Sequence, residues 1–448
     1  MKKSLNKIEN LLLYLLPIII FFSYYPVIRL GENNSMFFEL SLPLIWLLIF
    51  GIISLIRLPK ILAKYGWKKS VIILLFPAWM IASIFWSKNA LRGFLTTGIA
   101  ALIFLSVLNV INMKLDKEFL KKLLKTYLIS SVVAATICII QSFLDVFGVS
   151  RDVTLLCPGC VYSVLGFPHP NGLAIEPQFM GNMLIAPALI SLLFLHNAIK
   201  QNKDKRTVFG FLGLSIFLIM SLYICFSRGA IYAFGIAGAI MGIILLIRDK
   251  SLRATWLILP VLVGCVGGLL LQGIWAEISP TNENFAQGIQ RSVHQITLGK
   301  IDIREKVESE GEESTFSGYI EESTDIRLNL NEIAMGAWGH NNIWTGVGIG
   351  GAGVAINEYD NQLSSREIIQ NEYVNLLVEL GIIGVVLFMI FAIYIIKSMK
   401  NIKGGLLLIP IIIAYLITLC FFSGFPNVLH IYLLTPILYW VGQKRLLC

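Results

Sequence analysis

Apolar stretches of nearly constant length follow one another along most of the chain, separated by short polar segments. A transmembrane helix needs about 20 consecutive apolar residues, so windows of that length locate the predicted spans. They are 11–28, 36–56, 70–87, 92–112, 127–147, 178–197, 207–226, 229–247, 254–275, 374–396, 404–422 and 427–442. The pattern predicts an all-α polytopic membrane protein with about twelve transmembrane helices.

Composition and charge agree with this pattern. The 448 residues are 56% hydrophobic and only 14% charged, whereas a soluble protein carries about 25% charged residues. The net charge of +9 could indicate nucleic acid, but 25 of the 36 Lys and Arg residues fall in alternate segments between spans, on the side of the N-terminus. Basic segments of this kind stay in the cytoplasm. We therefore expect the bilayer as a partner, both termini in the cytoplasm and no nucleic acid.

One long hydrophilic segment interrupts the apolar pattern, between the ninth and tenth predicted spans. Residues 276–372 contain sixteen acidic and six basic residues, and the alternation of sides places them outside the cytoplasm. The stretch at about 303–325 is rich in Glu and Ser, which predicts a mobile acidic insertion. The chain thus divides into nine spans in 1–275, one large extracytoplasmic loop in 276–372 and three spans in 373–448.

A helix and a glycine-rich turn follow the acidic insertion. The rhythm of "DIRLNLNEIAMGAW" places Ile326, Leu330, Ile333 and Ala337 on one helical stripe. The stretch "GVGIGGAG" after it has the glycine spacing of a dinucleotide-binding loop, but no strand precedes it, and nucleotides are not available outside the cytoplasm. We expect no nucleotide and no other cofactor. The glycines predict instead a tight turn that brings the backbone close to the bilayer or a substrate.

Three motifs occur in order along the second half of the chain. "FSRGAIYAFGIAGAI" opens a span with Ser-Arg-Gly, and "DIRLNLNEIAMGAWGHNNIWTGVGIGG" places an arginine one helix before the glycine turn. "IIQNEYVNLLVELGIIGVVLF" enters the tenth span through Asn-x-Tyr-x-x-x-Leu. These motifs, with the span number and the loop position, resemble the O-antigen ligase and polymerase superfamily of membrane glycosyltransferases. The resemblance implies a GT-C-like fold in the bacterial cytoplasmic (inner) membrane, with an extracytoplasmic active site.

The resemblance further implies that two arginines bind the diphosphate of a polyprenyl-diphosphate-linked donor. Arg228 lies at the outer end of the span at 207–226, against the basic-inside trend, and Arg327 lies in the acidic loop. A guanidinium is permanently charged, and its planar fork matches phosphate oxygens. Stabilising the leaving diphosphate in this way needs neither nucleotide nor metal. The alternatives are a snorkelling arginine for Arg228 and an ordinary loop salt bridge for Arg327.

In the ligases of this superfamily a histidine followed by Asn acts as the base toward the acceptor hydroxyl. Here Gln370 precedes Asn371; glutamine cannot accept a proton at neutral pH, and the departure favours the polymerases, which are looser at this position. The catalytic candidates are therefore Gln370 itself and the nearby His340 and Glu372. His340 fits a base but also a structural imidazole, and Glu372 could instead cap the helix that it begins. Residues expected to face substrate in this region are Gly346, Gly348, Gly350 and Asn371.

A second polar loop, "GFPHPNGLAIEPQFMGN", precedes the sixth predicted span. Its Glu-Pro-Gln resembles the Glu-Pro-Ser element of exopolysaccharide polymerases, so Glu176 is a candidate to hydrogen-bond a sugar; the alternative is a helix-start carboxylate before Pro177. Cys157 and Cys160 of "LCPGC", with His169, could suggest zinc, but the second cysteine pair of a zinc site is missing. We expect no metal, and either a disulfide or two free thiols at these cysteines.

The expected activity is inverting transfer of a glycan from an undecaprenyl-type polyprenyl diphosphate to a glycan acceptor, independent of metal and nucleotide. The departure at the base favours a surface polysaccharide polymerase for O-antigen, capsule or exopolysaccharide, with a chain-length regulator protein as a possible partner. The close alternative is an O-antigen ligase that transfers to lipid A core or another acceptor. A transporter or flippase also commonly has twelve spans, but no internal repeat is apparent and midplane charges are scarce.

Overall fold

The computed structural model shows helices at the predicted spans. It describes residues 2–23, 27–30, 38–65, 67–147, 163–164, 167–168, 170–174, 176–249, 252–279, 284–297, 315–365, 367–400, 402, 404–421 and 428–446. Each of the twelve predicted windows overlaps a helix. Those helices are α1 (Lys2–Ile19), α2 (Leu42–Tyr65), α3 (Trp67–Ser83), α4 (Ala90–Asn112), α5 (Lys117–Val146), α6 (Pro177–Lys200), α7 (Lys205–Ile224), α8 (Arg228–Asp249), α9 (Ile258–Ile278), α13 (Glu372–Lys400), α14 (Ile409–Thr418) and α15 (Leu429–Gln443).

The length and composition of these helices make the chain a multi-pass, all-helical membrane protein. Eight of the described helices are long and apolar enough to cross a membrane, and two shorter apolar helices cover Leu74–Trp86 and Gly405–Thr418. Lipid offers the backbone no hydrogen-bond partner, so a spanning segment satisfies its own N–H and C=O groups as a helix. The number of twelve spans stays a prediction, because α1 begins with several charged residues and α15 has only 15 residues.

Shorter elements occupy the segments between the long helices. Two antiparallel strand pairs, which the apolar pattern did not predict, are β1 (Val27–Leu30) with β2 (Phe38–Ser41) and β3 (Ser163–Val164) with β4 (Phe167–Pro168). The 3-10 turns are η1 (Ile84–Trp86), η3 (Leu252–Leu257) and η4 (Gly405–Leu408). The segment between α9 and α13 contains α10 (Phe285–Ile296), α11 (Thr315–His340) and α12 (Ala352–Tyr359). Most of the predicted mobile insertion lies outside the described residues.

The predicted helix after the insertion is present as the second half of α11, and Leu330, Ile333 and Ala337 of the predicted stripe pack in its core. Leu330, Ala334 and Ala337 are buried and pack with residues of α12 and of the glycine turn. Ile326, predicted on the stripe, is 58% exposed. The packed stripe of α11 therefore begins at Leu330, one turn after Ile326.

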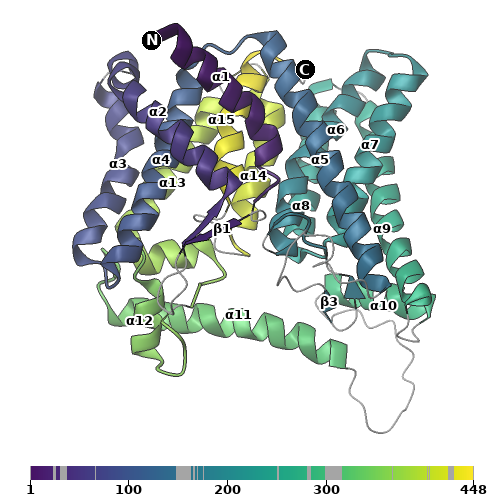
Figure 1. Ribbon diagram of the computed structural model, residues 1–448. Coiled ribbons are helices and arrows are strands. Elements are labelled where there is room, and N and C mark those ends of the chain that lie inside the picture. Colours follow the sequence, from purple (N-terminus) through teal and green to yellow (C-terminus); the bar gives the residue numbers. More distant parts are fainter. Residues whose placement is uncertain are drawn as a thin grey trace. The chain divides into compact units, whose positions relative to one another are not determined.

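The chain forms two compact units, each built from separate stretches of sequence. The first comprises Met1–Tyr14, Leu44–Lys117 and Asp325–Arg445; the second comprises Leu15–Pro43, Glu118–Thr324 and Leu446–Cys448. Within the first unit, α4 packs against α3 and α15, and α13 packs against α3, α12 and α14 (Figure 1). Within the second unit, α7 packs against α6 and α9, while α8 packs on α6 and α10 on α9.

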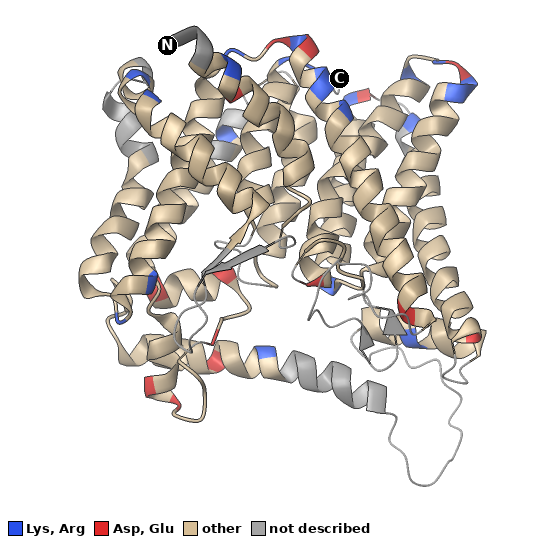
Figure 2. Ribbon diagram, viewed as in Figure 1, with Lys and Arg blue, Asp and Glu red and all other residues tan. Residues whose placement is uncertain are grey.

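Charged side chains lie mainly near the ends of the long helices in each unit, and the middles of these helices carry other residues (Figure 2). The second unit has one such polar group where α6 ends. His196 Nε2 lies 2.7 Å from Asp249 Oδ2, and Lys200 Nζ donates to Asp249 Oδ1 at 2.7 Å. These contacts join α6 to the last residue of α8. This distribution is the one that a bilayer imposes, since a charge is costly in the hydrocarbon core.

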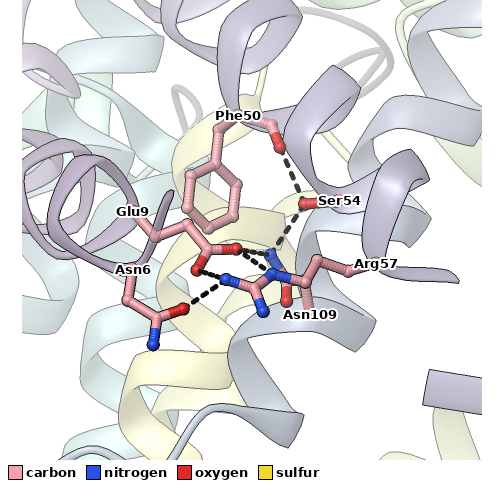
Figure 3. Close-up of polar contacts among 6 residues, drawn as sticks. All are labelled: Asn6, Glu9, Phe50, Ser54, Arg57 and Asn109. Carbon is pink, nitrogen blue, oxygen red and sulfur yellow. Dashed lines mark hydrogen bonds and ion pairs between the residues drawn. The ribbon is translucent and has the colours of Figure 1, made fainter. Parts of the chain in front are cut away.

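A buried polar network attaches α1 to α2 and α4 in the first unit (Figure 3). The Glu9 carboxylate, 3% exposed, accepts hydrogen bonds from Arg57 Nε at 3.0 Å and Arg57 Nη2 at 2.6 Å. Asn109 Nδ2 donates both to Glu9 Oε1 at 3.2 Å and to Ser54 Oγ at 3.1 Å. Arg57 Nη2 also donates to Asn6 Oδ1. A buried carboxylate needs such partners, because an uncompensated buried charge is strongly destabilising.

Candidate active site

Helix α13 is interrupted two turns after it begins. Gly381 has φ 65° and ψ −172°, outside the helical region, and such a break removes the helical hydrogen-bond partners of the groups around it. The glycine-rich segment that follows α11 replaces these partners. The glycine segment donates two hydrogen bonds to α13, from Val347 N to Val378 O (2.9 Å) and from Gly348 N to Glu379 O (2.8 Å). Helix α13 donates two in return, from Ile382 N to Ile343 O (3.1 Å) and from Ile383 N to Trp344 O (3.2 Å).

Two indole groups close the same break. Trp79 Nε1 of α3 donates to Leu380 O at 3.0 Å, and Trp86 Nε1 of η1 donates to Thr345 O at 3.3 Å. Non-helical backbone is tolerated at membrane depth only where protein satisfies it. The interrupted helix and the glycine segment therefore supply each other's backbone hydrogen-bond partners, which neither would have alone.

The glycine segment also hydrogen-bonds the turn that joins α3 to α4. Ser83 Oγ accepts from Ile349 N at 3.2 Å, Ser87 Oγ donates to Ile349 O at 2.8 Å, and Lys88 N donates to Val347 O at 3.1 Å. The segment is thus bonded on one side to α13 and on the other side to η1. This double attachment fixes its position in the first unit.

The glycines of this segment take left-handed conformations that other residues rarely adopt. Gly346, Gly348 and Gly350 have φ values of 65°, 83° and 79°. A Cβ atom on Gly348 would lie 2.3 Å from Ser87 Cα, and one on Gly350 would lie 2.5 Å from Gly93 N. The predicted tight turn with close backbone approach is confirmed, and the neighbour is the backbone of this chain. All three glycines are buried, and their contact with substrate stays a prediction.

Glu379 ties the glycine segment to α13 through its side chain as well. Its carboxylate, 7% exposed, is hydrogen-bonded by the backbone N–H groups of Gly350 and Ala352. Arg92 of α4 lies near enough to attract its negative charge. The Glu379 side chain therefore connects α13 with the glycine segment and with α4.

A cavity of about 130 Å³ lies beneath this arrangement, within the first unit. Its apolar wall comes from α3, α4 and the part of α13 after the break, and it is rich in phenylalanine. Its polar wall comes from α4, α13, α15 and the segment before α13. The polar and charged residues that line it are Arg92, Thr96, Glu367, Glu372, Asn375, Glu379, Tyr432 and Thr435.

The sequence of α13 places several of these groups on one face. Glu372, Asn375 and Glu379 lie at positions i, i+3 and i+7, which share one side of a helix, and all three line the cavity. Glu372 is 2% exposed. It does not cap the helix, because Asn371 Oδ1 does so by accepting from Tyr373 N at 3.0 Å and Val374 N at 3.3 Å. Of the predicted catalytic residues, Glu372 is the one that lines the cavity.

Gln370 and Asn371 lie just before α13, beside the cavity but not among its lining residues. Gln370 is half-buried, and its Oε1 atom is buried without a hydrogen-bond partner among the described residues. The role of Asn371 that the structure shows is the helix cap. Contact of Asn371 with substrate and a catalytic role of Gln370 stay predictions.

His340, the first candidate base, is the exposed last residue of α11. Its Nδ1 atom lies 3.0 Å from Gly336 O, and its ring packs on Tyr359 at 4.9 Å between centroids. It does not line the cavity. Arg327 is half-exposed on α11, and within the described part of the chain no ion pair is found for it, so the loop salt bridge considered above is not present there.

Arg228 and Glu176 belong to the second unit. Arg228 is the first residue of α8, as predicted for a Ser-Arg-Gly motif that opens a span, and Ser227 Oγ caps this helix by accepting from Ala230 N at 3.3 Å. Glu176 is the exposed N-cap residue of α6, and its carboxylate accepts from Gln178 Nε2 at 2.5 Å instead of capping the helix. The proposed roles of both residues toward diphosphate and sugar stay predictions.

The cysteines and histidine of the other loop, Cys157, Cys160 and His169, lie outside the described residues. In the part of the chain that the structure describes, no group of three or more His, Cys, Asp or Glu side chains is arranged to hold a metal.

Among the cavity residues that the prediction of site residues missed are Arg92, Glu367 and Asn375. A signal for Arg92 was present, because it and Lys88 occupy a short segment between two spans on the side that is otherwise poor in basic residues. The same argument had singled out Arg228. Glu367 and Asn375 carried no such signal, since acidic residues are common in this loop and an asparagine one turn into a helix is ordinary.

A comparison with known protein families found one match. Residues 213–389 match the family model described as O-Antigen ligase. A search of curated proteins found no match to the chain. The matched range begins within α7 and ends within α13, so it includes Arg228, the second half of α11, the glycine segment and the break at Gly381. This match confirms the resemblance drawn from the three motifs, which is to the O-antigen ligase and polymerase superfamily of membrane glycosyltransferases.

Proposed function

We propose that the chain transfers a glycan from a polyprenyl diphosphate to a hydroxyl group of a second glycan, and that Glu372 is the base of this reaction. The observation that carries the proposal is the position of Glu372, a carboxylate only 2% exposed that lines the cavity under the glycine segment. Glu372 lies within the matched family range, and it lines the cavity, whereas the other predicted catalytic residues, His340 and Gln370, do not.

The reaction requires one proton transfer and one displacement. The acceptor hydroxyl oxygen attacks the anomeric carbon of the donor sugar, the bond from that carbon to the diphosphate oxygen breaks, and the electron pair leaves with the diphosphate. The hydroxyl proton passes to the Glu372 carboxylate. Attack from the side opposite the diphosphate inverts the anomeric configuration. Neither nucleotide nor metal is required, and we expect activity to survive a chelator.

The surroundings of Glu372 support this role over one for His340. Asn371 provides the helix cap, so the Glu372 side chain is not used for it. Tyr432 and Asn375 line the same cavity and can donate hydrogen bonds to a sugar. His340 is exposed, packs on Tyr359 and does not line the cavity. A base must reach the proton that it abstracts, so the position of a candidate base is judged before its pKa.

Two arginines are the candidates to bind the donor diphosphate, Arg228 in the second unit and Arg327 in the first. Arg228 begins α8 inside the matched family range, and Arg327 presents a guanidinium for which no ion pair is found in the described part of the chain. A bidentate guanidinium stabilises charge that develops on a phosphate oxygen. Glu176, at the exposed start of α6, is the candidate for a hydrogen bond to a donor or acceptor sugar.

The glutamine at the position of the ligase base favours a polymerase of surface polysaccharide over a ligase. A polymerase lengthens a lipid-linked glycan, whereas a ligase moves it to lipid A core or another acceptor. The protein would lie in the bacterial inner membrane, with both termini in the cytoplasm and the cavity facing outward, and a chain-length regulator would be its partner. A transporter is disfavoured because the family match implies a glycosyltransferase-like enzyme.

The test uses purified full-length protein and a polyprenyl-diphosphate oligosaccharide, with longer lipid-linked products measured by gel electrophoresis. General-base assistance is worth roughly 10²–10⁴-fold, so we expect Glu372→Gln to lower the rate by about 100-fold or more. The matched control is Glu332→Gln, because Glu332 is exposed on α11 and does not line the cavity. His340→Ala is expected to stay close to wild type. A Glu372→Gln variant that folds normally and extends glycans at the wild-type rate would exclude the assignment.

The orientation is tested separately with single cysteines in a cysteine-free background. Ser364 precedes α13 on the predicted outer side, and Asn202 lies in the turn between α6 and α7 on the predicted inner side. A membrane-impermeant thiol reagent applied to intact cells is expected to label a cysteine at Ser364 and not one at Asn202. The reverse pattern would invert the topology and place the cavity on the cytoplasmic side.

A further inference from the structure

The cavity of the first unit is long, and its lining changes from polar to apolar along α4. The lining residues of this helix begin with Arg92 and Thr96 and continue with Ile103, Phe104 and Val107. From Arg92 to Val107 a helix rises by about 22 Å, which is a large part of the roughly 30 Å hydrocarbon core of a bilayer. The cavity therefore extends along most of a helix that is long enough to span the membrane.

Helix α13 shows the same change in the same direction. Before the break at Gly381 it lines the cavity with polar residues such as Glu372 and Asn375, and after the break with Phe388 and Phe391. Two helices that are far apart in the sequence thus show the same order of polar and apolar groups.

Contacts between α4 and α13 show that the two polar stretches lie together and that the two apolar stretches do too. Arg92 attracts the Glu379 carboxylate, and the ring centroids of Phe104 and Phe391 are 4.9 Å apart. The cavity therefore has a polar end, beside Arg92 and Glu379, and an apolar end, beside Phe104 and Phe391.

Rings from three helices surround the apolar end. The ring centroid of Phe76 of α3 lies 5.9 Å from that of Phe104 and 5.5 Å from that of Phe388, and Phe76 and Phe388 are buried. An enclosed apolar space does not attract water, and a sugar placed there would leave hydroxyl groups without hydrogen-bond partners. The chemistry of these rings therefore suits a hydrocarbon chain.

We propose that the apolar end binds the isoprenoid chain of the polyprenyl diphosphate donor, with the diphosphate directed toward the polar end. The proposal rests on the proposed function, because that function supplies this donor. A polyprenyl diphosphate is an apolar chain with one charged end, which is the order of groups along the cavity. The polar end contains the proposed base Glu372 and the guanidinium of Arg92, a group that pairs with phosphate.

The other hydrocarbon at hand is an acyl chain of a bilayer phospholipid. The donor is favoured because the apolar end is continuous with the space beside Glu372, so a chain bound there leads its own head group to the proposed base. Each methylene group that is buried strengthens binding by roughly fourfold. A side chain that excludes a few carbons of the isoprenoid from the apolar end is expected to weaken binding by about tenfold or more.

The experiment labels the purified full-length protein with a polyprenyl phosphate that carries a diazirine in the middle of its chain and no sugar. After illumination, the labelled peptides are identified by mass spectrometry. We expect label on the α3, α4 and α13 segments that line the apolar end, and we expect excess unlabelled polyprenyl phosphate, but not phosphatidylglycerol, to prevent it. Val107→Trp fills the apolar end and is expected to lower the apparent affinity by about tenfold or more. The matched control is Val386→Trp, because Val386 is 50% exposed on α13 and does not line the cavity.

The outcomes separate this inference from the proposed function, because labelling requires no transfer. Label that phosphatidylglycerol prevents equally well would identify a bilayer lipid as the occupant and overturn the inference. A folded Val107→Trp variant that binds the probe like Val386→Trp would overturn it too. If Val107→Trp does not fold, the peptides labelled in the wild type decide, and label confined to other segments refutes the inference even where glycans are lengthened. Competed label at the apolar end without any lengthening would refute the transferase and leave the chain site standing.

Discussion

Gly348 is the position where a single methyl group tests the central arrangement most directly. We predict that Gly348→Ala destabilises the first unit and that Gly339→Ala, the matched control, does not. Gly348 has φ 83°, and a Cβ atom there would lie 2.3 Å from Ser87 Cα and 2.6 Å from Ser83 O. These neighbours are backbone atoms, which cannot rotate away. At Gly339, near the end of α11, a Cβ atom would meet nothing within 4 Å.

The magnitude follows from two costs. A left-handed conformation costs an L-residue roughly 1–2 kcal/mol, and overpacking costs about 1–3 kcal/mol. The expected loss is therefore about 2–5 kcal/mol, which corresponds to a lower melting temperature by roughly 5–15 °C. Alanine at an exposed helical position instead gains about 0.5–1 kcal/mol over glycine, so Gly339→Ala is expected to be neutral or slightly stabilising.

The assay is thermal unfolding of the purified protein in detergent, followed by tryptophan fluorescence. Trp79, Trp86 and Trp344, three of the nine tryptophans, contact the break or the glycine segment, so part of the signal reports on this region. If Gly348→Ala and Gly339→Ala melt at the same temperature as the wild type, the packing of the glycine segment against η1 described above is incorrect.

Further predictions concern the buried network and the arginines. Glu9→Gln is expected to lose about 3 kcal/mol, near the low end for breaking a buried pair because the Arg57 side chain is still 19% exposed. Glu118→Gln, whose 73% exposed carboxylate pairs with a lysine on the same helix, is expected to change stability by under about 0.5 kcal/mol in the same melting assay. Arg228→Lys and Arg327→Lys are each expected to insert normally and lose about 100-fold in glycan lengthening, because a point charge does not replace a bidentate fork; two lysine variants with wild-type rates would remove the diphosphate assignment.

The helices could be predicted from the sequence because the bilayer leaves a spanning segment one choice. An apolar run of sufficient length must satisfy its backbone internally, and each predicted window overlaps a helix. The break at Gly381 could not be predicted in the same way, because a glycine inside an apolar run also fits an unbroken helix. Its conformation depends on carbonyl groups at Ile343 and Trp344, which reach it only through the fold.

In the candidate site, too, residues marked by the local sequence were predicted, and residues brought together by the fold were not. Glu372 and the glycine turn were found because local spacing and the start of a span mark them. Arg92 and Asn375 were missed, because what distinguishes them is a cavity formed by helices far apart in the sequence. The choice between a cap and a cavity residue at Glu372 also needed the structure, since Asn371 and Glu372 both suit a helix start and one of them does the capping.

Because the first unit is built from distant stretches of sequence, its parts are synthesised at different times. The indole of Trp79 bonds Leu380, 301 residues later, and that of Trp440 bonds Val110, 330 residues earlier. Ribosomes add about 5–20 residues per second, so α3 and α4 wait in the membrane for tens of seconds at the lower rates before α13 emerges. Most of the second unit is synthesised much sooner, because it is largely the continuous stretch Glu118–Thr324. The cavity is consequently among the last features to form, and a chain released before α13 has been synthesised can assemble most of the second unit but lacks the cavity.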